Sequence, residues 1–344
     1  MQLLMIFNFL MANSEKMIKK FNLDLQNLAP ICISVYTRIE HFKNCIESLV
    51  VNDLAKHSVL YIFSDAAKPG DEEAVSKVRE YASSIEGFKD IKLIFQKKNN
   101  FKKNMQDLYL LPFATNSKSI IMEDDVVVQK SFLKFMNIAL NVYEKSDDIF
   151  CICGRLGPEN HSEKSNDAQA FQIPNMSGIG YWKKEYFEFL NDHRSCHPWL
   201  RFKKDIFYSI KFMLFFGISY ILLYKTMYEK NLFYEDVLTM EYIFRKKQLA
   251  IIPPFTLALN KGYDGSGIYC GINEEFQNEK FLRQSDNFGF PIKFNQKQAR
   301  QKTQKQFKST TGLKPNYVRQ VYAFVSHFYQ VPKIIRDFFK KMGF

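Results

Sequence analysis

The sequence of 344 residues lacks the glycine-rich signatures of two common nucleotide-binding folds. No Gly-x-Gly-x-x-Gly follows the first apolar run, and no Gly-Lys-Ser or Gly-Lys-Thr loop occurs. The first absence argues against a dinucleotide-dependent enzyme and the second against a P-loop NTPase. Tryptophan is scarce as well: there are two, although 34 Phe and 18 Tyr bring the aromatic content to 16%.

Cysteine pairs and long uncharged apolar runs are also lacking. The six cysteines show neither repeated pairs nor metal-ligand spacing, so we expect reduced thiols in a cytoplasmic protein. The segment Met1 to Met11 is apolar but too short to span a bilayer, and no basic residues precede it, so it makes a poor signal peptide. The run from Ile206 to Tyr224 approaches the ~20 residues of a membrane span. Lys211, two serines and a central glycine favour instead a buried helix or one that lies on a membrane surface.

Acidic residues are nearly absent from the C-terminal segment. Between Lys293 and Phe344 there are twelve Lys or Arg and one acid, a net charge of +11 out of +12 for the chain. Apolar residues recur among them at helical spacing, which predicts basic amphipathic helices on an anionic membrane surface. A solvated basic tail is the plainer alternative. Nucleic acid is a competing partner for such a charge, but no nucleic-acid-binding motif accompanies it, and we expect none to bind.

Short apolar runs alternate with helical periodicity in the first half of the chain. We expect strands at 30–36, 59–65, 91–95 and 119–122, and helices between them at 39–51, 72–84 and 104–111. Strands that alternate with helices of this length form βαβ units and a parallel sheet. The predicted fold class is therefore α/β, with a Rossmann-like, mostly parallel central sheet flanked by helices.

Three consecutive acids, Glu123, Asp124 and Asp125, interrupt an apolar stretch. Acids inside a buried strand would each cost several kcal/mol unless paired, hydrated or bound to a cation. We therefore expect one strand to end at Met122 and another to begin near Val126, with the acids at the carboxyl edge of the sheet. Open α/β sheets bind ligands at that edge, and oxygen-only ligands suit Mg²⁺ or Mn²⁺. The alternative is an acidic turn that joins two strands and binds nothing.

A second acidic pair, Glu235 and Asp236, opens a segment of helical periodicity that ends in Arg-Lys-Lys at 245–247. The helix dipole favours acids at the start of a helix and bases at its end. An ordinarily charged helix is therefore a sufficient interpretation of this segment when it is taken alone.

Two further segments combine glycine with aromatic or acidic residues. In the first, Gly180 and Trp182 precede a predicted short helix; an aromatic face beside glycine suits the apolar C–H surface of a sugar, and a Trp buried at a turn is the alternative. In the second, residues 260–267, the glycines permit a tight turn and close approach to a ligand. Asp264 in that segment either faces an acceptor or metal or belongs to a simple Asp-Gly turn.

These segments, in this order, resemble the glycosyltransferases of the GT-A fold, with family 2 and the N-acetylglucosaminyltransferase-I-like enzymes as the most similar families. The resemblance covers roughly residues 30–271. It rests on the strand ends Val35-Tyr36-Thr37-Arg38 and Ser64-Asp65, on Glu123-Asp124-Asp125 as a variant of the Asp-x-Asp motif, and on Glu235-Asp236 about a hundred residues later. Related bacterial sequences often carry Thr-His after the second glycine segment. Ile268-Tyr269 stands there in this chain, so no histidine role carries over.

The resemblance implies a role for each of these residues. Asp236 would be the catalytic base, with Glu235 beside it, and Asp125 would bind a divalent metal, Mn²⁺ or Mg²⁺. The nucleotide of the donor would be contacted by Thr37, Arg38, Asp65, Glu123 and Asp124, with Glu123 on the ribose or the donor sugar. The donor sugar and the acceptor would be contacted by Gly180, Trp182 and Asp264.

We accordingly expect an inverting, metal-dependent glycosyltransferase that takes a sugar from a nucleotide-sugar donor, UDP-linked by expectation. Its acceptor would be a glycan or a lipid-linked molecule of bacterial surface-polysaccharide or lipooligosaccharide synthesis, at the cytoplasmic face of the inner membrane. The expected organisation is a lead-in at 1–29, a GT-A domain at 30–292 and a basic helical tail at 293–344. Two alternatives remain. A nucleotidyltransferase that makes nucleotide sugars would need a Gly-rich loop after the first strand, which is missing; the other is a non-catalytic, membrane-bound adaptor with a degenerate transferase fold.

Overall fold

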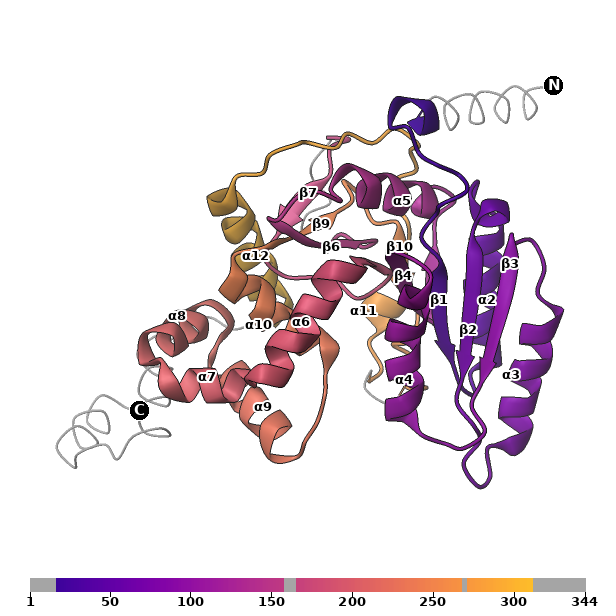
Figure 1. The fold of residues 1–344 in the computed structure, drawn as a ribbon, viewed down its shortest axis with the longest axis horizontal. Coiled ribbons are helices and arrows are strands. Elements are labelled where there is room, and N and C mark those ends of the chain that lie inside the picture. Colours follow the sequence, from indigo (N-terminus) through magenta and orange to yellow (C-terminus); the bar gives the residue numbers. More distant parts are fainter. Residues whose placement is uncertain (1–16, 158–164, 268–270, 312–344) are drawn as a thin grey trace.

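The computed structural model describes residues 17–157, 165–267 and 271–311 (Figure 1). Its main sheet has eight strands in the order β3-β2-β1-β4-β8-β6-β9-β7, and a smaller sheet pairs β10 with β5. The strands are β1 Ile31–Val35, β2 Val59–Ser64, β3 Asp90–Phe95, β4 Lys118–Glu123, β5 Val126–Val128, β6 Ile149–Cys153, β7 Gln169–Phe171, β8 Ile179–Trp182, β9 Leu249–Ile252 and β10 Ala258–Asn260. The α-helices are α2 Ile39–Val50, α3 Glu72–Ser84, α4 Phe101–Leu110, α5 Phe132–Val142, α6 Lys183–Ser195, α7 Pro198–Lys204, α8 Ile206–Phe216, α9 Ile218–Glu229, α10 Glu235–Lys246, α11 Glu274–Gln277 and α12 Gln296–Thr311.

All strands of the main sheet except β8 and β7 run in the same direction. β1 pairs in parallel with β2 and β4, β2 with β3, and β6 with β9. β8 lies antiparallel between β4 and β6, and β7 is antiparallel to β9. The predicted fold class, α/β with a mostly parallel central sheet flanked by helices, is confirmed. The antiparallel β8 is an addition that the sequence analysis did not predict.

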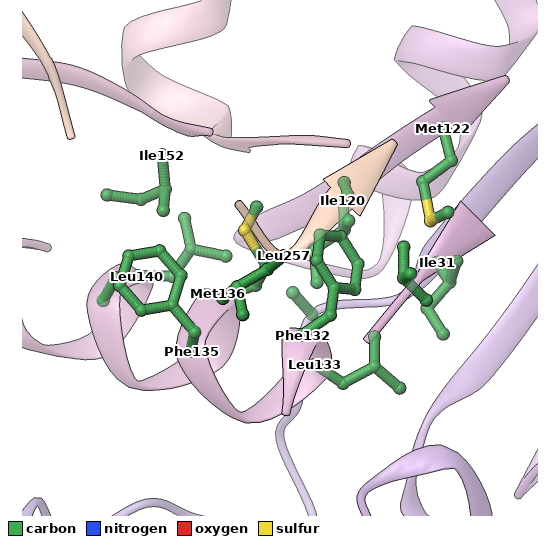
Figure 2. Close-up of a cluster of buried hydrophobic side chains, with 14 of the residues drawn as sticks. Ile31, Ile120, Met122, Phe132, Leu133, Phe135, Met136, Leu140, Ile152 and Leu257 are labelled. Atoms are coloured by element: carbon green, nitrogen blue, oxygen red, sulfur yellow. The ribbon is translucent and has the colours of Figure 1, made fainter. Parts of the chain in front are cut away.

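Helix α5 covers one face of the sheet and holds much of the core there. Phe135 and Leu140 from α5 lie near Ile120 of β4 and Ile152 of β6, and all four side chains are fully buried (Figure 2). Burying a side chain of this size contributes roughly 1.5–3 kcal/mol. This packing fixes the carboxyl end of β4, where the acidic turn follows.

A second core cluster lies on the opposite face, where α4, α6 and helices α8 to α10 contribute aromatic side chains. The apolar run at 206–224 is part of this cluster, but it is not one helix. Gly217 has φ of +92° and separates α8 from α9, a backbone conformation that glycine adopts without steric penalty. Phe212 and Tyr224, one from each helix, are fully buried, which agrees with the expected buried helix.

In the part of the chain described here, no single helix is long and apolar enough to cross a membrane. Helices α8 and α9 meet this criterion only as a pair, and the pair is bent by 117°.

The first part of the basic C-terminal segment packs on the sheet. α12 lies against β7, where Gln172 N donates to Thr303 Oγ1 at 2.8 Å. Ala299 and Thr303 are buried in this contact. The amphipathic helices predicted after residue 312 lie outside the described residues.

Candidate active site

The acidic triplet lies at the carboxyl end of β4, as predicted. β4 ends at Glu123, one residue later than expected, and β5 begins at Val126. The turn between them holds Asp124 and Asp125, which are 5% and 4% exposed. Two nearly buried carboxylates side by side require a counter-charge within contact distance.

Arg38 supplies that counter-charge, because β1 runs parallel to β4 and the loop after β1 therefore meets the turn. Its guanidinium donates to Asp124 through Nη2 and, more weakly, through Nε at 3.4 Å. The distance from Nη2 to Asp125 Oδ2 is 2.9 Å. Arg38 was predicted to contact the nucleotide; its pairing with Asp124 and Asp125 is a finding of the structure.

The arginine does not neutralise the whole acidic turn. Although Glu123 is exposed as a residue, surrounding protein desolvates its carboxyl and raises its pKa to about 8, with Asp125 and Asp124 adding to the effect and Arg38 opposing it. Burial likewise raises the pKa of Asp124 to about 6 against the opposing pull of Arg38. A cation bound at this turn would favour the ionised form of these carboxyl groups and lower their pKa values.

The loop after β10 closes over this turn. Lys261 N donates to the backbone oxygen of Asp125 at 2.8 Å. A β-carbon on Gly262 would lie 2.1 Å from Asp125 Oδ2, so only glycine lets the backbone approach the carboxylate this closely. Gly262 was within the predicted glycine segment, but its contact with Asp125 depends on the β5–β10 pairing, which joins residues far apart in sequence.

Asp264 lies further along the same loop and faces α2. Its Oδ2 is 2.9 Å from His41 Nε2, and its Oδ1 accepts from Ser266 N at 2.9 Å. The hydrogen bonds from Ser266, with a smaller effect of His41, hold the pKa of Asp264 well below its ordinary value. The loop carries Asp264 into the neighbourhood of the acidic turn, but its carboxylate is engaged by the protein; His41 had no sequence signal of its own.

The second acidic pair opens α10, as predicted. Glu235 lies beside a cluster of buried tyrosines, and Tyr186 OH donates to Glu235 Oε2 at 3.2 Å. Oε1 of Glu235 and the hydroxyl of Tyr181 are buried without a hydrogen-bond partner among the described residues. Burial raises the pKa of Glu235 well above its ordinary value, while the hydrogen bond from Tyr186 opposes the shift. The partly buried Glu235 carboxyl therefore favours its neutral form more than an exposed glutamate does.

Asp236 differs from its neighbour because its side chain is exposed. Protein still surrounds its carboxylate closely enough that desolvation raises its pKa, while backbone N–H groups at the start of α10 lower it. Asp236 also contributes to the raised pKa of Glu123, whose side chain is likewise exposed. Glu123 and Asp236 therefore lie close enough to influence each other electrostatically.

The predicted nucleotide contacts lie at the ends of β1 and β2. Thr37 is half-buried in the loop between β1 and α2. Asp65 is 4% exposed, and its Oδ1 accepts from Ala66 N at 2.8 Å and Asn100 N at 2.9 Å. Asp65 therefore ties the end of β2 to the start of α4 and shapes this end of the site through the backbone.

Gly180 and Trp182 are not at the site. Trp182 is 3% exposed, and its indole Nε1 donates to the backbone oxygen of Leu140 at 2.9 Å. A β-carbon on Gly180 would meet the side chains of Leu140 and Met136 at 3.1 and 3.2 Å. Both residues belong to the core between β8 and α5, so the sugar contact predicted for them is corrected. The alternative of a buried Trp describes its position.

The side chains that could bind a divalent metal at this site form only part of a coordination shell. No group of three or more His, Cys, Asp or Glu side chains arranged to hold a metal occurs within residues 17–157, 165–267 and 271–311. Oδ1 of Asp125, however, is buried and has no hydrogen-bond partner among these residues. Mg²⁺ is usually held by one or two carboxylates together with substrate phosphates and water. Asp125 offers one carboxylate oxygen of the kind that this mode of binding requires.

Comparison with known proteins gives weak structural likenesses and no sequence match. No family model matches the chain, and no curated protein matches it. The mannosyltransferase PcManGT from Pyrobaculum calidifontis, solved with GDP-Man and Mn²⁺, has a TM-score of 0.32 and 11% identity over 52% of this chain and 53% of its own. S. aureus TarS 1–349, solved with UDP, has a TM-score of 0.34 and 14% identity over 48% and 49%. A cytidylyltransferase from Leptospira borgpetersenii has a TM-score of 0.29 and 8% identity over 48% and 64%.

Each likeness spans about half of this chain and less than two thirds of the compared chain. Two of the three structures are glycosyltransferases, but at this level of similarity they assign no activity to this chain. The function must be argued from the site itself.

Proposed function

We propose that this protein is an inverting, metal-dependent glycosyltransferase that uses a nucleotide-sugar donor, UDP-linked by expectation. The observation that carries the proposal is the meeting of two acidic motifs. Asp236 at the start of α10 lies within electrostatic range of Glu123 at the end of β4, and Oδ1 of Asp125 is buried without a hydrogen-bond partner among the described residues. Such a pairing provides a place for the diphosphate and a carboxylate for the acceptor.

The donor would bind with its diphosphate at the acidic turn. There a divalent metal held by Asp125 Oδ1 would supply neutralisation of the charge that develops on the leaving nucleoside diphosphate. Arg38 keeps Asp124 and Asp125 in place through its guanidinium. Thr37 and the backbone held by Asp65 border the nucleotide, and Glu123 lies toward the ribose and the donor sugar.

Asp236 would accept the proton of the acceptor hydroxyl as that hydroxyl attacks the anomeric carbon. A base works best when its pKa lies near the operating pH, and desolvation raises the pKa of Asp236 in that direction. Glu235 accepts a hydrogen bond from Tyr186 at the start of α10, so its role in this proposal is to position Asp236. Attack from the side opposite the leaving group inverts the anomeric configuration.

The further parts of the proposal rest on sequence. A glycan or lipid-linked acceptor in bacterial surface-glycan synthesis, at the cytoplasmic face of the inner membrane, follows from the basic C-terminal segment and from the family resemblance. We place no weight on the nucleotidyltransferase alternative, because no feature of the site favours it.

The test is release of nucleoside diphosphate from a panel of nucleotide sugars, with Mn²⁺, with Mg²⁺ and with EDTA. We expect slow, metal-dependent release from one donor, abolished in Asp125→Asn. Asp90→Asn is the matched control, because Asp90 is exposed at the opposite, amino edge of the sheet. Release of pyrophosphate from a nucleoside triphosphate and a sugar phosphate would support the nucleotidyltransferase instead.

Asp236 is tested with an acceptor present, since hydrolysis does not require it. Asp236→Asn should lower transfer at least ~100-fold, the usual contribution of a general base, while donor binding by calorimetry stays unchanged. If no donor binds or is hydrolysed with either metal, the enzyme proposal is overturned and the adaptor interpretation takes its place.

A further inference from the structure

Helix α8 presents an exposed stripe of apolar and basic side chains on one side. Phe207, Lys211 and Leu214 follow one another at helical spacing and are all exposed, Phe207 by 82% of its surface. The opposite side of the same helix, including Phe212 and Phe216, is buried in the core. α8 is therefore apolar on both sides, and one apolar side has no partner among the described residues.

A groove of about 240 Å³ runs between α8 and α12 beside this stripe. α8 contributes its apolar lining, and α12 contributes Arg300 and Gln304. Two cations lie at the groove over aromatic rings: Lys211 Nζ is 5.7 Å from the Phe244 ring centroid, and the Arg300 guanidinium is 5.2 Å from that of Phe215. The rings hold the cations beside apolar surface without neutralising them.

The surroundings of the groove are predominantly basic. Lys203 and Lys204 end α7 next to the start of α8, and both are exposed. No carboxylate among the described residues forms an ion pair with these two lysines. The same holds for Lys211 and Arg300. Asp205 is the acid closest to them in sequence, and it caps α8 by accepting from Tyr208 N at 2.9 Å. An occupant of this surface must therefore be apolar in part and negatively charged.

We propose that this α8–α12 surface docks on an anionic lipid bilayer, with Phe207 and Leu214 in the headgroup–acyl boundary and Lys211 and Arg300 on lipid phosphates. An interfacial helix of this kind buries its apolar side in the outer few ångströms of the bilayer and keeps cations at the phosphates. The chain's own residues 312–344 fit the surface less well, because they carry six Lys or Arg and one acid and would meet like charge. The proposal does not depend on the transferase activity.

The decisive measurement places a tryptophan at the proposed contact. The chain's own Trp182 and Trp199 are 3% and 7% exposed, so they give a background that vesicles leave unchanged. Phe207→Trp in the full chain is mixed with vesicles of equal phosphatidylglycerol and phosphatidylcholine whose acyl chains carry bromine. Val51→Trp is the matched control, since Val51 is 60% exposed and directly follows α2, a helix that lies away from α8 (Figure 1).

We expect a blue shift and strong quenching for Phe207→Trp and neither for Val51→Trp. If the chain binds the vesicles but Phe207→Trp is not quenched, another part carries the binding and the proposal is overturned. If the tryptophan emission of Phe207→Trp is already blue-shifted in the absence of vesicles, the chain itself covers the surface. That result also overturns the proposal. Absence of vesicle binding does the same.

A charge variant tests the role of the cations separately. Lys211→Gln with Arg300→Gln should bind these vesicles about 30-fold more weakly, because each near-surface cation contributes ~1 kcal/mol. Lys56→Gln with Lys102→Gln removes two exposed cations elsewhere and should bind as the parent does. Equal binding of both double variants, or equal binding of the parent to pure phosphatidylcholine, would refute an anionic partner.

Discussion

Replacing Arg38 by methionine tests the electrostatic core of the site. The change keeps the approximate length of the side chain and removes its charge. Asp124 and Asp125, whose side chains are 7% and 5% exposed, would lose their shared counter-ion. Removing one partner of a buried ion pair typically destabilises a protein by ~3–5 kcal/mol. We expect the lower part of that range, because Arg38 is itself 22% exposed and water enters as it leaves.

The corresponding shift in melting temperature follows from the size of the chain. At about 2.1 cal/mol/K per residue, 344 residues give an unfolding entropy of roughly 0.7 kcal/mol/K. A loss of ~3 kcal/mol then lowers the melting temperature by about 4 °C. Arg194→Met is the control, because Arg194 is exposed on α6, and it should melt within a degree of the parent.

Metal separates this explanation from a simple packing defect. The variant has one positive charge fewer at the acidic turn, so Mn²⁺ should raise its melting temperature by more than that of the parent, since ligands that bind only the folded state stabilise it. Calorimetry with and without Mn²⁺ measures both effects. The reasoning would be refuted if Arg38→Met had the same melting temperature as Arg194→Met and if Mn²⁺ raised that temperature by no more than it raises that of the parent.

Three further outcomes are expected. Gly262→Ala places a β-carbon 2.1 Å from Asp125 Oδ2. The resulting overpacking at the site costs ~1–3 kcal/mol, so donor hydrolysis should fall at least ~10-fold. Gly271→Ala is the control and should leave hydrolysis unchanged, because a β-carbon there has no atom within 4 Å. Trp182→Phe leaves the Leu140 oxygen without its donor and should lower the free energy of unfolding by ~1–3 kcal/mol in denaturant titrations. Burial lowers the pKa of His193 to about 4. Between about pH 6.5 and pH 4 this histidine therefore binds a proton in the unfolded chain but not in the folded chain. Stability should therefore fall from pH 6.5 to 4 by up to ~3 kcal/mol, and His193→Gln should remove that part of the slope; equal slopes would contradict it.

Local sequence determined the first half of the fold closely. The helix predicted at 72–84 is α3, and the strands predicted at 59–65 and 91–95 are β2 and β3 to within one residue at each end. These elements depend on apolar periodicity and on helix-end charge, which act between neighbours in the chain. The acidic turn belongs to the same class, because burying three carboxylates in a strand would cost more than ending the strand.

Only the tertiary structure decided the contents of the site. The insertion of β8 between β4 and β6 put Trp182 in the core, and the β5–β10 pairing brought Gly262 onto Asp125. The parallel pairing of β1 with β4 brought Arg38 to the two aspartates. Each contact joins residues distant in sequence, and no local pattern encodes which strands will be neighbours. The sequence alone therefore determined which residues carry charge at strand and helix ends, and the sheet order determined which of those charges meet.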